Sequence, residues 1–532
     1  MAIDPLDYHL RTRHAPFHPA RGPGWLDWDN QPDPFRRFVG SPVVLLDREA
    51  GGPDPAYDAV LEGTLPAPAP VDWSSVSRLF FDALALSAWK EVGDTRWSLR
   101  VNPSSGNLHP TEAYLVAGPV SELAAEAAVW HYQPYLHGLE QRAVLSEATW
   151  RRLAGDLPPG AVLVGLSSIL WREAWKYGER AFRYCQHDLG HAIAGLSLAA
   201  AGLGWRARLL DSVPEGALGA LLGTSEQVGA EAETAEALLA VYPEAPFPLA
   251  QWRHYRLPAL PRLVWQGAPA SLSAEHEDWP VIDAVVEATH HPGLPASGWR
   301  IPPVRLPEGP TRPPSFRHLV RTRRSAVAMD GTTTLPRAAF LRTVHRLLPG
   351  APPFDTLPWA PEVHPIFFVH RVEGLAPGVY ALPRDPSCGL REALRAGRTW
   401  ELVTPELPLV CLEAGDVRRR AQSISCDQEI ASDGAFAVAM LADLGGALAR
   451  FGPSFYRRLH WEAGAIGQVL YLEAESDGVR GTGIGCFYDD LALDAVGLVP
   501  GAGWRSIYHF TTGGPVDDAR LRTVGAYRHL EG

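Results

Sequence analysis

The sequence has little cysteine, almost no lysine and no excess of positive charge. Its 532 residues contain five cysteines, Cys185, Cys388, Cys411, Cys426 and Cys486, which are scattered along the chain. Their odd number and wide spacing predict neither a disulfide framework nor a zinc site and fit a reducing compartment. Acidic residues outnumber basic ones by 60 to 48, a net charge of -12. This balance argues against nucleic acid or an anionic membrane as a partner.

The sequence also lacks a predicted secretion signal and a predicted membrane span. The first residues, MAIDPLDYHL, carry acids and no apolar run, so we expect no signal peptide and a cytoplasmic location. The longest apolar segment, GAFAVAMLADLGGALARFG (residues 434–452), is interrupted by Asp443. It predicts a packed helix rather than a helix in a bilayer.

Lysine is scarce enough to make each one informative. Only Lys90 and Lys176 are lysines among the 48 basic residues. Arginine therefore holds almost every position where a surface cation would serve, and a lysine in this chain has a stronger claim to a chemical role.

The length suits two domains rather than one. Between Pro258 and Pro314 the chain turns rich in proline and loses helical periodicity, as a linker or an irregular wrapping segment would. We therefore predict a first domain over residues 1–255, a proline-rich linker over 256–313 and a second domain over 314–532.

The two halves resemble each other. Residues 175–204 align with residues 449–478 without a gap, and PSSGNLHPTEAYLV aligns with PWAPEVHPIFFVHR. A third pair, YHLRTRHAP and HLVRTRRSA, lies near the start of each half. Repeats in the same order predict a duplicated domain, so that the chain is its own dimer. Helices alternating with short strands such as LPLVCLEA indicate an α+β fold with helices packed on a sheet.

The best-matching repeat predicts a long helix in each half. Apolar residues follow a helical stripe in both copies, and both copies also carry small residues, at Gly190, Gly195, Gly464 and Gly467. These positions would let two such helices approach closely, and we expect the two helices to form the interface between the halves.

Four short segments could carry chemistry. RTRRS, residues 321–325, groups guanidinium donors that suit phosphate; the alternative is a solvated basic turn. PSSGN, residues 103–107, offers hydroxyl and amide groups to a flat heterocycle, or is a turn before a strand. GTGIGCF, residues 481–487, is a glycine-rich strand end that could face a ligand, or is a tight turn. WKYGER, residues 175–180, places an amine beside a phenol, which could move a proton, or is an exposed helix start.

Together these segments resemble the flavin-dependent nitroreductase superfamily, and more narrowly its SagB-type (thiazole/oxazole-forming) dehydrogenases, in a tandem two-domain form. Further stretches that carry the resemblance are LDWDNQPDPFRRF and WKYGERAFRYCQHDLGH. Members of the family are usually homodimers with FMN in the interface. The resemblance implies two tandem nitroreductase-like domains that form an intramolecular pseudo-dimer.

The resemblance also implies a composite site. The family's phosphate-binding residues match Arg323, Arg324, Ser325 and Arg520, and the strand end beside flavin N5 matches Gly485 and Cys486. The loop that the family supplies from the partner subunit matches Pro103, Ser104, Ser105 and Asn107. The catalytic pair of the azole-forming members matches Lys176 and Tyr177, and Tyr177, assisted by Lys176, would remove a ring proton.

The reciprocal site has lost its matching residues. Ala15 stands where the second half has Ser325, and Trp359, Ala360 and Glu362 replace the two serines and the asparagine. Arg450 and Phe451 stand in place of the lysine and tyrosine. One FMN per chain is therefore expected. The family's second arginine after the serine is Val327 here, so one contact to the cofactor is missing or replaced.

The predicted function is oxidation of an azoline-like substrate, a small molecule or a modified peptide, by hydride transfer to FMN. One alternative is a nitro- or quinone-reducing enzyme with NAD(P)H as the reductant, which would not need the lysine–tyrosine pair. The other is a flavin-free scaffold that binds a partner. An internal pseudo-dimer is compatible with a monomer or a homodimer.

Overall fold

The computed structural model describes residues 3–243, 255–295, 314–499, 501 and 503–531. Two seven-stranded antiparallel sheets dominate the fold. The first has the strand order β2 (Val43–Leu45), β7 (Gly138–Leu145), β6 (Ala127–Gln133), β5 (Thr111–Ala117), β8 (Val162–Ile169), β10 (Glu233–Pro243), β9 (Trp205–Leu209). The second has the order β14 (Glu401–Thr404), β15 (Leu407–Ala414), β13 (Gly378–Ala381), β12 (His364–Val369), β16 (Phe436–Asp443), β18 (Trp504–Gly513), β17 (Arg480–Ile484).

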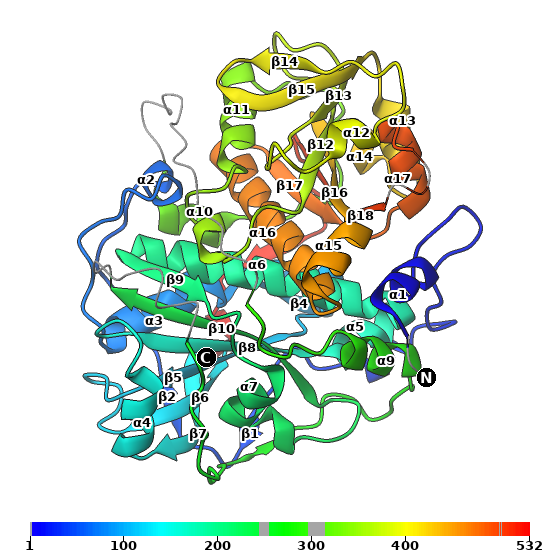
Figure 1. Ribbon diagram of the computed structural model, residues 1–532. Coiled ribbons are helices and arrows are strands. Elements are labelled where there is room, and N and C mark those ends of the chain that lie inside the picture. The colour runs from blue at the N-terminus through cyan, green and yellow to red at the C-terminus, as the bar shows by residue number, and fades with distance from the viewer. Residues whose placement is uncertain (1–2, 244–254, 296–313, 500, 502, 532) are drawn as a thin grey trace.

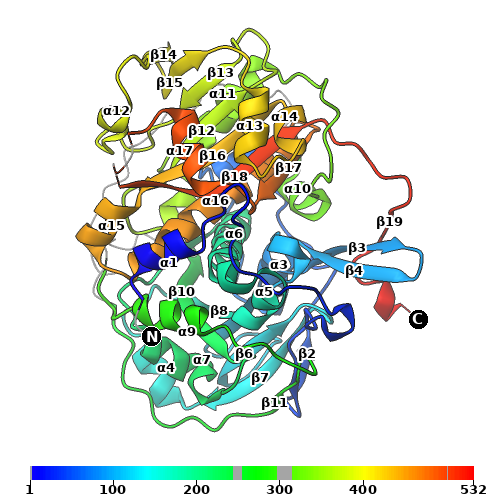
Figure 2. The same cartoon turned by 90° about the vertical axis from the view of Figure 1, so that its right-hand side faces the viewer.

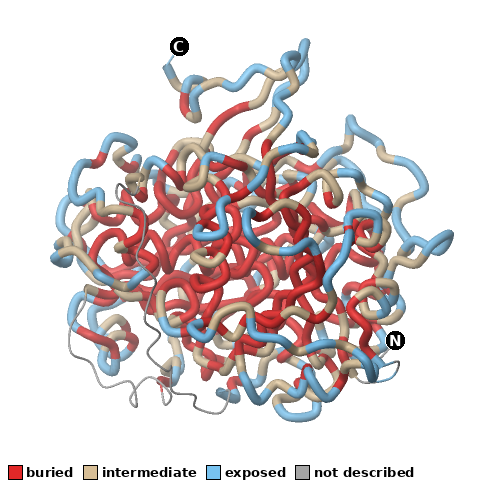
Figure 3. The backbone as a smooth tube through the Cα atoms, turned by 90° about the horizontal axis from the view of Figure 1, so that it is seen from above, coloured by how far each residue is buried: buried red, intermediate tan, exposed pale blue. Residues whose placement is uncertain are grey.

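Two long helices lie between the sheets (Figure 1). They are α6 (Ala181–Gly202) and α16 (Phe455–Ser476). One hydrophobic cluster includes residues of both halves, and a separate cluster covers the outer face of each sheet. The outer helices include α4 (Glu147–Ala154) and α7 (Glu215–Leu222) on the first sheet and α13 (Arg418–Ile424) and α17 (Asp489–Val496) on the second. Each sheet thus has one face toward the shared interior, and buried backbone fills the centre of the molecule (Figure 3).

The duplication is visible in the element boundaries. Helix α16 begins and ends 274 residues after α6, since 455 − 181 and 476 − 202 both equal 274. The same difference separates α5 (Leu170–Tyr177) from α15 (Leu444–Phe451) and β8 from β16. The predicted α+β fold, with two similar domains joined as an intramolecular pseudo-dimer, is confirmed.

The apolar segment over residues 434–452 differs from its sequence-based prediction. We expected one packed helix, but residues 436–443 form strand β16, and only Leu444–Phe451 form helix α15. Strand β16 lies between β12 and β18, and seven of its eight residues are buried. Such a strand does not alternate between polar and apolar residues, so its composition resembles that of a buried helix.

Glycines let α6 and α16 cross in close contact. A Cβ atom on Gly190 would lie 2.3 Å from the Trp461 carbonyl oxygen and 2.9 Å from the Gly464 Cα atom. A Cβ atom on Gly464 would lie 2.3 Å from the His187 carbonyl oxygen. The neighbouring atoms belong to backbone and cannot rotate away, so this crossing requires glycine on both helices.

Segments outside the two sheets tie the halves together. Strand β19 (Arg522–Val524), near the C-terminus, pairs with β3 (Leu86–Val92), which pairs in turn with β4 (Thr95–Arg100) (Figure 2). Near the other end, helix α1 (Pro5–Arg11) leads to His14, whose backbone N–H donates to Asp489 of the second half at 3.0 Å. Each half therefore extends a segment across the other, as subunits of an exchanged dimer do.

The proline-rich region packs on the first half where it is described. Strand β11 (Ala268–Pro269) pairs with β1 (Phe38–Val39), and helix α9 (Pro280–Ala288) contributes Val281 and Val285 to the shared core. Residues 296–313 of the predicted linker lie outside the described residues. Within the described ranges, no helix is long and apolar enough to cross a bilayer.

The helix crossing can be tested by adding one methyl group. We expect Gly190→Ala to lower the free energy of unfolding by about 1–3 kcal/mol, because overpacking against fixed backbone strains the interface. Gly216→Ala on α7 is the matched control, since nothing lies within 4 Å of a Cβ atom there. Urea unfolding of both variants measures the difference. A Gly190→Ala protein as stable as the control would contradict the close crossing.

Candidate functional site

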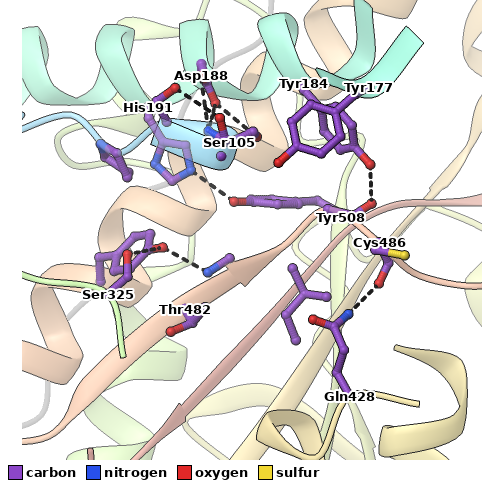
Figure 4. A pocket seen from close by; sticks show the side chains of 17 residues that line it. Ser105, Tyr177, Tyr184, Asp188, His191, Ser325, Gln428, Thr482, Cys486 and Tyr508 are labelled. Atoms are coloured by element: carbon purple, nitrogen blue, oxygen red, sulfur yellow. Dashed lines mark hydrogen bonds between the residues drawn. The ribbon is translucent and has the colours of Figure 1, made fainter. Parts of the chain in front are cut away.

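A cavity of about 260 Å³ lies where the two halves meet. Helix α6 and the loop before β5 form one wall, and strands β17 and β18 form the other (Figure 4). The lining residues are Pro103, Ser104, Ser105, Gly106, Tyr177, Tyr184, Asp188, His191, Ser325, Gln428, Tyr471, Thr482, Gly483, Ile484, Gly485, Cys486 and Tyr508. The site thus needs both halves of the chain.

The first-half wall is built on the Pro103–Asn107 loop. Asp188 of α6 accepts hydrogen bonds from Ser105 through its backbone N–H at 3.1 Å and its hydroxyl at 3.3 Å. The Ser104 hydroxyl accepts from the His109 backbone N–H at 2.8 Å, which closes the turn. Gly106 has φ of 57°, and a Cβ atom there would lie 2.5 Å from the Tyr177 hydroxyl oxygen. Glycine is therefore needed for Tyr177 to reach over the loop.

The second-half wall is the glycine-rich end of β17. A Cβ atom on Gly485 would lie 2.4 Å from the Tyr184 ring, and the Gly485 carbonyl accepts from the Tyr184 hydroxyl at 3.1 Å. The Gly483 N–H donates to the Tyr471 hydroxyl at 2.9 Å, and that hydroxyl also meets Ser325 Oγ at 3.0 Å. Hydroxyl-bearing side chains thus make up much of the cavity lining, namely Tyr177, Tyr184, Tyr471, Tyr508, Ser104, Ser105, Ser325 and Thr482.

A buried ion pair fixes the two walls relative to each other. Arg180 Nη1 lies 3.1 Å and Arg183 Nη1 lies 2.6 Å from the carboxylate oxygens of Asp489, and all three side chains are at most 2% exposed. Although burial raises it, the pKa of Asp489 lies below its ordinary value because both guanidinium groups stabilise the carboxylate. Arg180 also donates to the Gly485 carbonyl at 3.3 Å.

Two carboxyl groups belong to the first-half side of the cavity, which Asp188 lines and Glu173 does not. Burial raises the pKa of Asp188 to about 7, against the hydrogen bonds from Ser104 and Ser105 that lower it. Burial, and then the charge of Asp188, raises the pKa of Glu173 well above its ordinary value. Glu173 is fully buried, and neither of its carboxyl oxygens has a hydrogen-bond partner among the described residues. A neutral Glu173 and an Asp188 that titrates near neutral pH follow from this environment.

Tyr177 is a partly buried phenol beside these acids. Burial, and then the charge of Glu173, raises the pKa of Tyr177 well above its ordinary value. Its ring packs against Tyr184 with centroids 4.6 Å apart, and Lys176 Nζ lies 5.4 Å from its ring centroid. The side chain is therefore a neutral phenol at neutral pH.

Positive charge gathers beyond the Ser325 end of the cavity. Burial, and then the charges of Arg324 and Arg480, lowers the pKa of Lys90. Burial, and then Arg323 and Arg480, lowers the pKa of Arg324 to about 10. Arg323 is buried, and its Nε and Nη1 have no hydrogen-bond partner among the described residues. Glu475 and Asp517 lie among these cations and offset part of the charge, and Asp517 pairs with Arg480 at 2.7 Å. The positive charge that remains would stabilise a further anion.

The structure brings seven predicted site residues to the cavity: Pro103, Ser104, Ser105, Tyr177, Ser325, Gly485 and Cys486. Lys176 lies beside Tyr177, and Arg323 and Arg324 lie in the adjacent cation group. The Asn107 side chain instead donates to the Ser98 carbonyl at 2.6 Å. Arg520 is 82% exposed and pairs with Asp518. The structure thus separates Asn107 and Arg520 from the other predicted residues.

Sequence reasoning missed Lys90, Arg480, Glu173 and Asp188 as site residues. The scarcity of lysine marked Lys90 as strongly as Lys176, and that signal could have found it. Glu173 lies three residues before Lys176 on α5 and would be expected on the same face. Arg480 and Asp188 carry no local signal, because their position depends on how the halves pack.

The equivalent position in the other half is filled. Glu462 is the counterpart of Asp188, 274 residues on, and it accepts hydrogen bonds from the backbone N–H groups of Glu362 and Val363 at 3.2 Å. Arg384 forms an ion pair with it. Beyond the end of β9 there is a space of only about 10 Å³, lined by residues that include Leu210, Asp211, Arg458 and Trp461. That volume admits at most a water molecule.

No protein-family model and no curated protein matches the sequence. A crystal structure assigned to a nitroreductase from Anabaena variabilis is similar over 97% of this chain and 100% of its own, with a TM-score of 0.69 and 22% identity. The E. coli microcin synthetase McbBCD complex matches 37% of this chain and 71% of its own, with a TM-score of 0.27 and 18% identity. A nitroreductase family protein from Clostridium novyi matches 38% and 86%, with a TM-score of 0.24 and 14% identity. The full-length similarity shows that this chain has the nitroreductase fold.

Proposed function

We propose that the protein is an FMN-dependent oxidoreductase that oxidises an azoline-like substrate, as a SagB-type dehydrogenase does. The observation that carries the proposal is the cavity between the halves, where the loop at Pro103–Gly106 and Tyr177 face the glycine-rich strand end at Gly483–Cys486. This wall of glycine backbone and hydroxyl groups suits a flat, polar-edged ring system.

The residues around the cavity fit FMN. Arg324, Lys90 and Arg480 would hold a phosphate at one end, with the Ser325 hydroxyl beside them. The unpaired donor atoms of buried Arg323 lie in the same group and gain from a nearby anion. The serines of the loop and the backbone of Gly483 and Gly485 would contact the ring. When bound there, FMN supplies the two-electron redox chemistry, and the protein supplies position and electrostatics.

The protein's own contribution is to move a proton. Tyr177 is predicted to take a ring proton from the substrate with the help of Lys176. Because the pKa of Tyr177 is raised by burial, its phenol can accept a proton only as its own proton moves on to another base. Asp188, with a pKa of about 7, is the nearby carboxyl that can receive it at neutral pH. Glu173, which burial keeps protonated, is not the acceptor of this proton.

One FMN per chain is part of the proposal. Arg458 and Trp461 occupy the reciprocal position. In the second half, the loop that corresponds to Pro103–Asn107 carries Trp359, which is 3% exposed and packs against Glu462. Extraction of the flavin and its absorbance spectrum should give one FMN per chain. Two flavins per chain would contradict this assignment, and a colourless protein that takes up no FMN would favour a scaffold.

The phosphate end of the site can be tested by comparing two flavins. We expect Lys90→Met to weaken FMN binding about tenfold, because it removes one charge-assisted contact, and to leave riboflavin binding unchanged. Quenching of flavin fluorescence measures both affinities. Arg96→Met, on the neighbouring strand with its guanidinium over Trp89, is the control. A wild-type protein that binds riboflavin as tightly as FMN would exclude a phosphate site here.

The predicted catalytic pair has its own test. Lys176→Ala should lower the turnover of a thiazoline-containing peptide at least about 100-fold, the usual contribution of acid–base groups, while the FMN content stays that of the wild type. Oxygen consumption and flavin absorbance measure the two quantities. Unchanged turnover would refute the role of Lys176. Rapid bleaching of the wild-type flavin by NADPH would favour the alternative, a nitro- or quinone-reducing enzyme.

The buried acid gives a pH-dependent prediction that needs no substrate. Since the pKa of Glu173 is raised in the folded state, its contribution to stability is present below about pH 4.5 and is lost as pH rises. Glu173→Gln should therefore match the wild type near pH 4.5 and become more stable than it by up to about 1.4 kcal/mol for each pH unit above that. Thermal unfolding between pH 4.5 and 8 measures the difference. Glu287→Gln, at an exposed position, should show no such trend, and a flat difference for Glu173→Gln would contradict the burial argument.

A further inference from the structure

Two cysteines from distant parts of the sequence meet at the edge of the cavity. Cys426 lies in the turn between α13 and α14 (Ile430–Asp433), and Cys486 directly follows β17. Cys486 is exposed and lines the cavity, where Figure 4 shows it above Gln428, and Cys426 is partly buried. Neither thiol has a part in the proton transfer proposed above.

Hydrogen bonds hold the two segments side by side. The Tyr488 backbone N–H donates to the Ile424 carbonyl at 2.8 Å, and the Gln428 side-chain amide donates to the Cys486 carbonyl at 3.0 Å. The Tyr488 hydroxyl adds a bond to Asp427 at 3.4 Å. These contacts flank both cysteines, so the thiols stay near each other without any covalent link.

The turn that carries Cys426 is conformationally costly. Cys426 has φ of 53° and Asp427 has φ of 57°, so two successive residues other than glycine adopt the left-handed region. Such strain persists only where the surrounding contacts impose it, and it is concentrated at functional sites. Here the imposed conformation holds the turn that carries Cys426 beside the strand end that carries Cys486.

The thiols differ in reactivity. The Cys426 thiol on the neighbouring turn lowers the pKa of Cys486, and the charge of Arg180 lowers it further, against the effect of burial. Burial raises the pKa of Cys388 to about 11 and also raises that of Cys411. The thiolate is the nucleophile, so Cys486 should react before either of these.

We propose that Cys426 and Cys486 form a redox-active dithiol that reacts with small-molecule disulfides at the mouth of the cavity. The Cys486 thiolate attacks one sulfur of the small disulfide, forms a mixed disulfide and releases one thiolate. The Cys426 thiol then loses its proton and attacks the Cys486 sulfur, which forms the internal disulfide and releases the second small thiol. The two cysteines are oxidised by two electrons, and the small disulfide is reduced to two thiols.

The proposal goes beyond the flavin chemistry and does not require it. The step needs only a low-molecular-weight disulfide, and a small thiol in excess reverses it. A closed Cys426–Cys486 bridge would link the Ile424–Gln428 turn covalently to the strand end that forms one cavity wall. Because Cys486 itself lines the cavity, the redox state of the pair changes the chemistry of that wall.

The test uses the full-length protein and oxidised glutathione as the probe. Oxidation should remove two free thiols and give one linked peptide pair, Cys426 with Cys486, in a protease digest analysed by mass spectrometry. Cys486 should react at least about tenfold faster than Cys388 or Cys411, in line with their thiolate fractions. The variants Cys388→Ser and Cys411→Ser are matched controls and should form the same bridge.

Two further variants separate the roles of the thiols. Cys426→Ser should accumulate a stable glutathione adduct on Cys486, because the second thiol is missing, and Cys486→Ser should form neither adduct nor bridge at the cavity. The proposal is overturned if the wild type forms no Cys426–Cys486 bridge, or if Cys388 and Cys411 react as fast as Cys486. The mapping of wild-type thiols alone decides this, even if a variant does not fold.

Discussion

The structure depends on the crossing of α6 and α16 at Gly190 and Gly464. Each glycine lies against backbone of the opposite helix, so the two halves approach as closely as their main chains permit. The helices carry Asp188 and Tyr184 on one side and Tyr471 on the other, which line the same cavity. The distance between the helices therefore sets the distance between the two walls of the site. Because backbone packs against backbone at the crossing, no side chain can rotate there to compensate for a shift of one helix. The geometry of the site therefore follows from the interface.

The two halves keep one fold but use it differently. In the first half, Asp188 accepts hydrogen bonds from the Pro103–Asn107 loop and also lines the cavity. In the second half, the equivalent Glu462 accepts from its loop in the same way, but Arg384 neutralises it and Trp359 covers it. The interaction between helix and loop is thus structural in both halves, and only the first combines it with an open space. A duplicated chain can lose one site in this manner because the fold still requires the hydrogen bonds that remain.

The sequence predicted what depends on local pattern and repetition. The offset of 274 residues predicted that α6 and α16 begin and end at corresponding positions. The glycines of these two segments predicted that the helices are in close contact. The strand over residues 436–443 was missed because burial on both faces removes the alternation that marks a strand. The loop at Pro103 and the pair at Lys176 were found through resemblance to a family, and they lie at or beside the cavity. Arg480 and Asp188 were missed because their significance comes from neighbours that are distant in the sequence. The side chains of Asn107 and Arg520 lie away from the cavity for another reason, because they bind partners that are near in the sequence, Ser98 and Asp518.

Electrostatics connects the two ends of the cavity to the interface. The cluster of Asp489 with Arg180 and Arg183 is buried, so removal of Asp489 would leave two uncompensated guanidinium charges inside the protein. Arg180 also holds the Gly485 carbonyl and lowers the pKa of Cys486. One guanidinium group thus positions the strand end that faces the predicted flavin and activates the thiol next to it. At the opposite wall, burial keeps Glu173 neutral and leaves Asp188 able to titrate. The cavity therefore has a proton-accepting side from the first half and a thiol-bearing side from the second, and both depend on groups that pack across the pseudo-dimer.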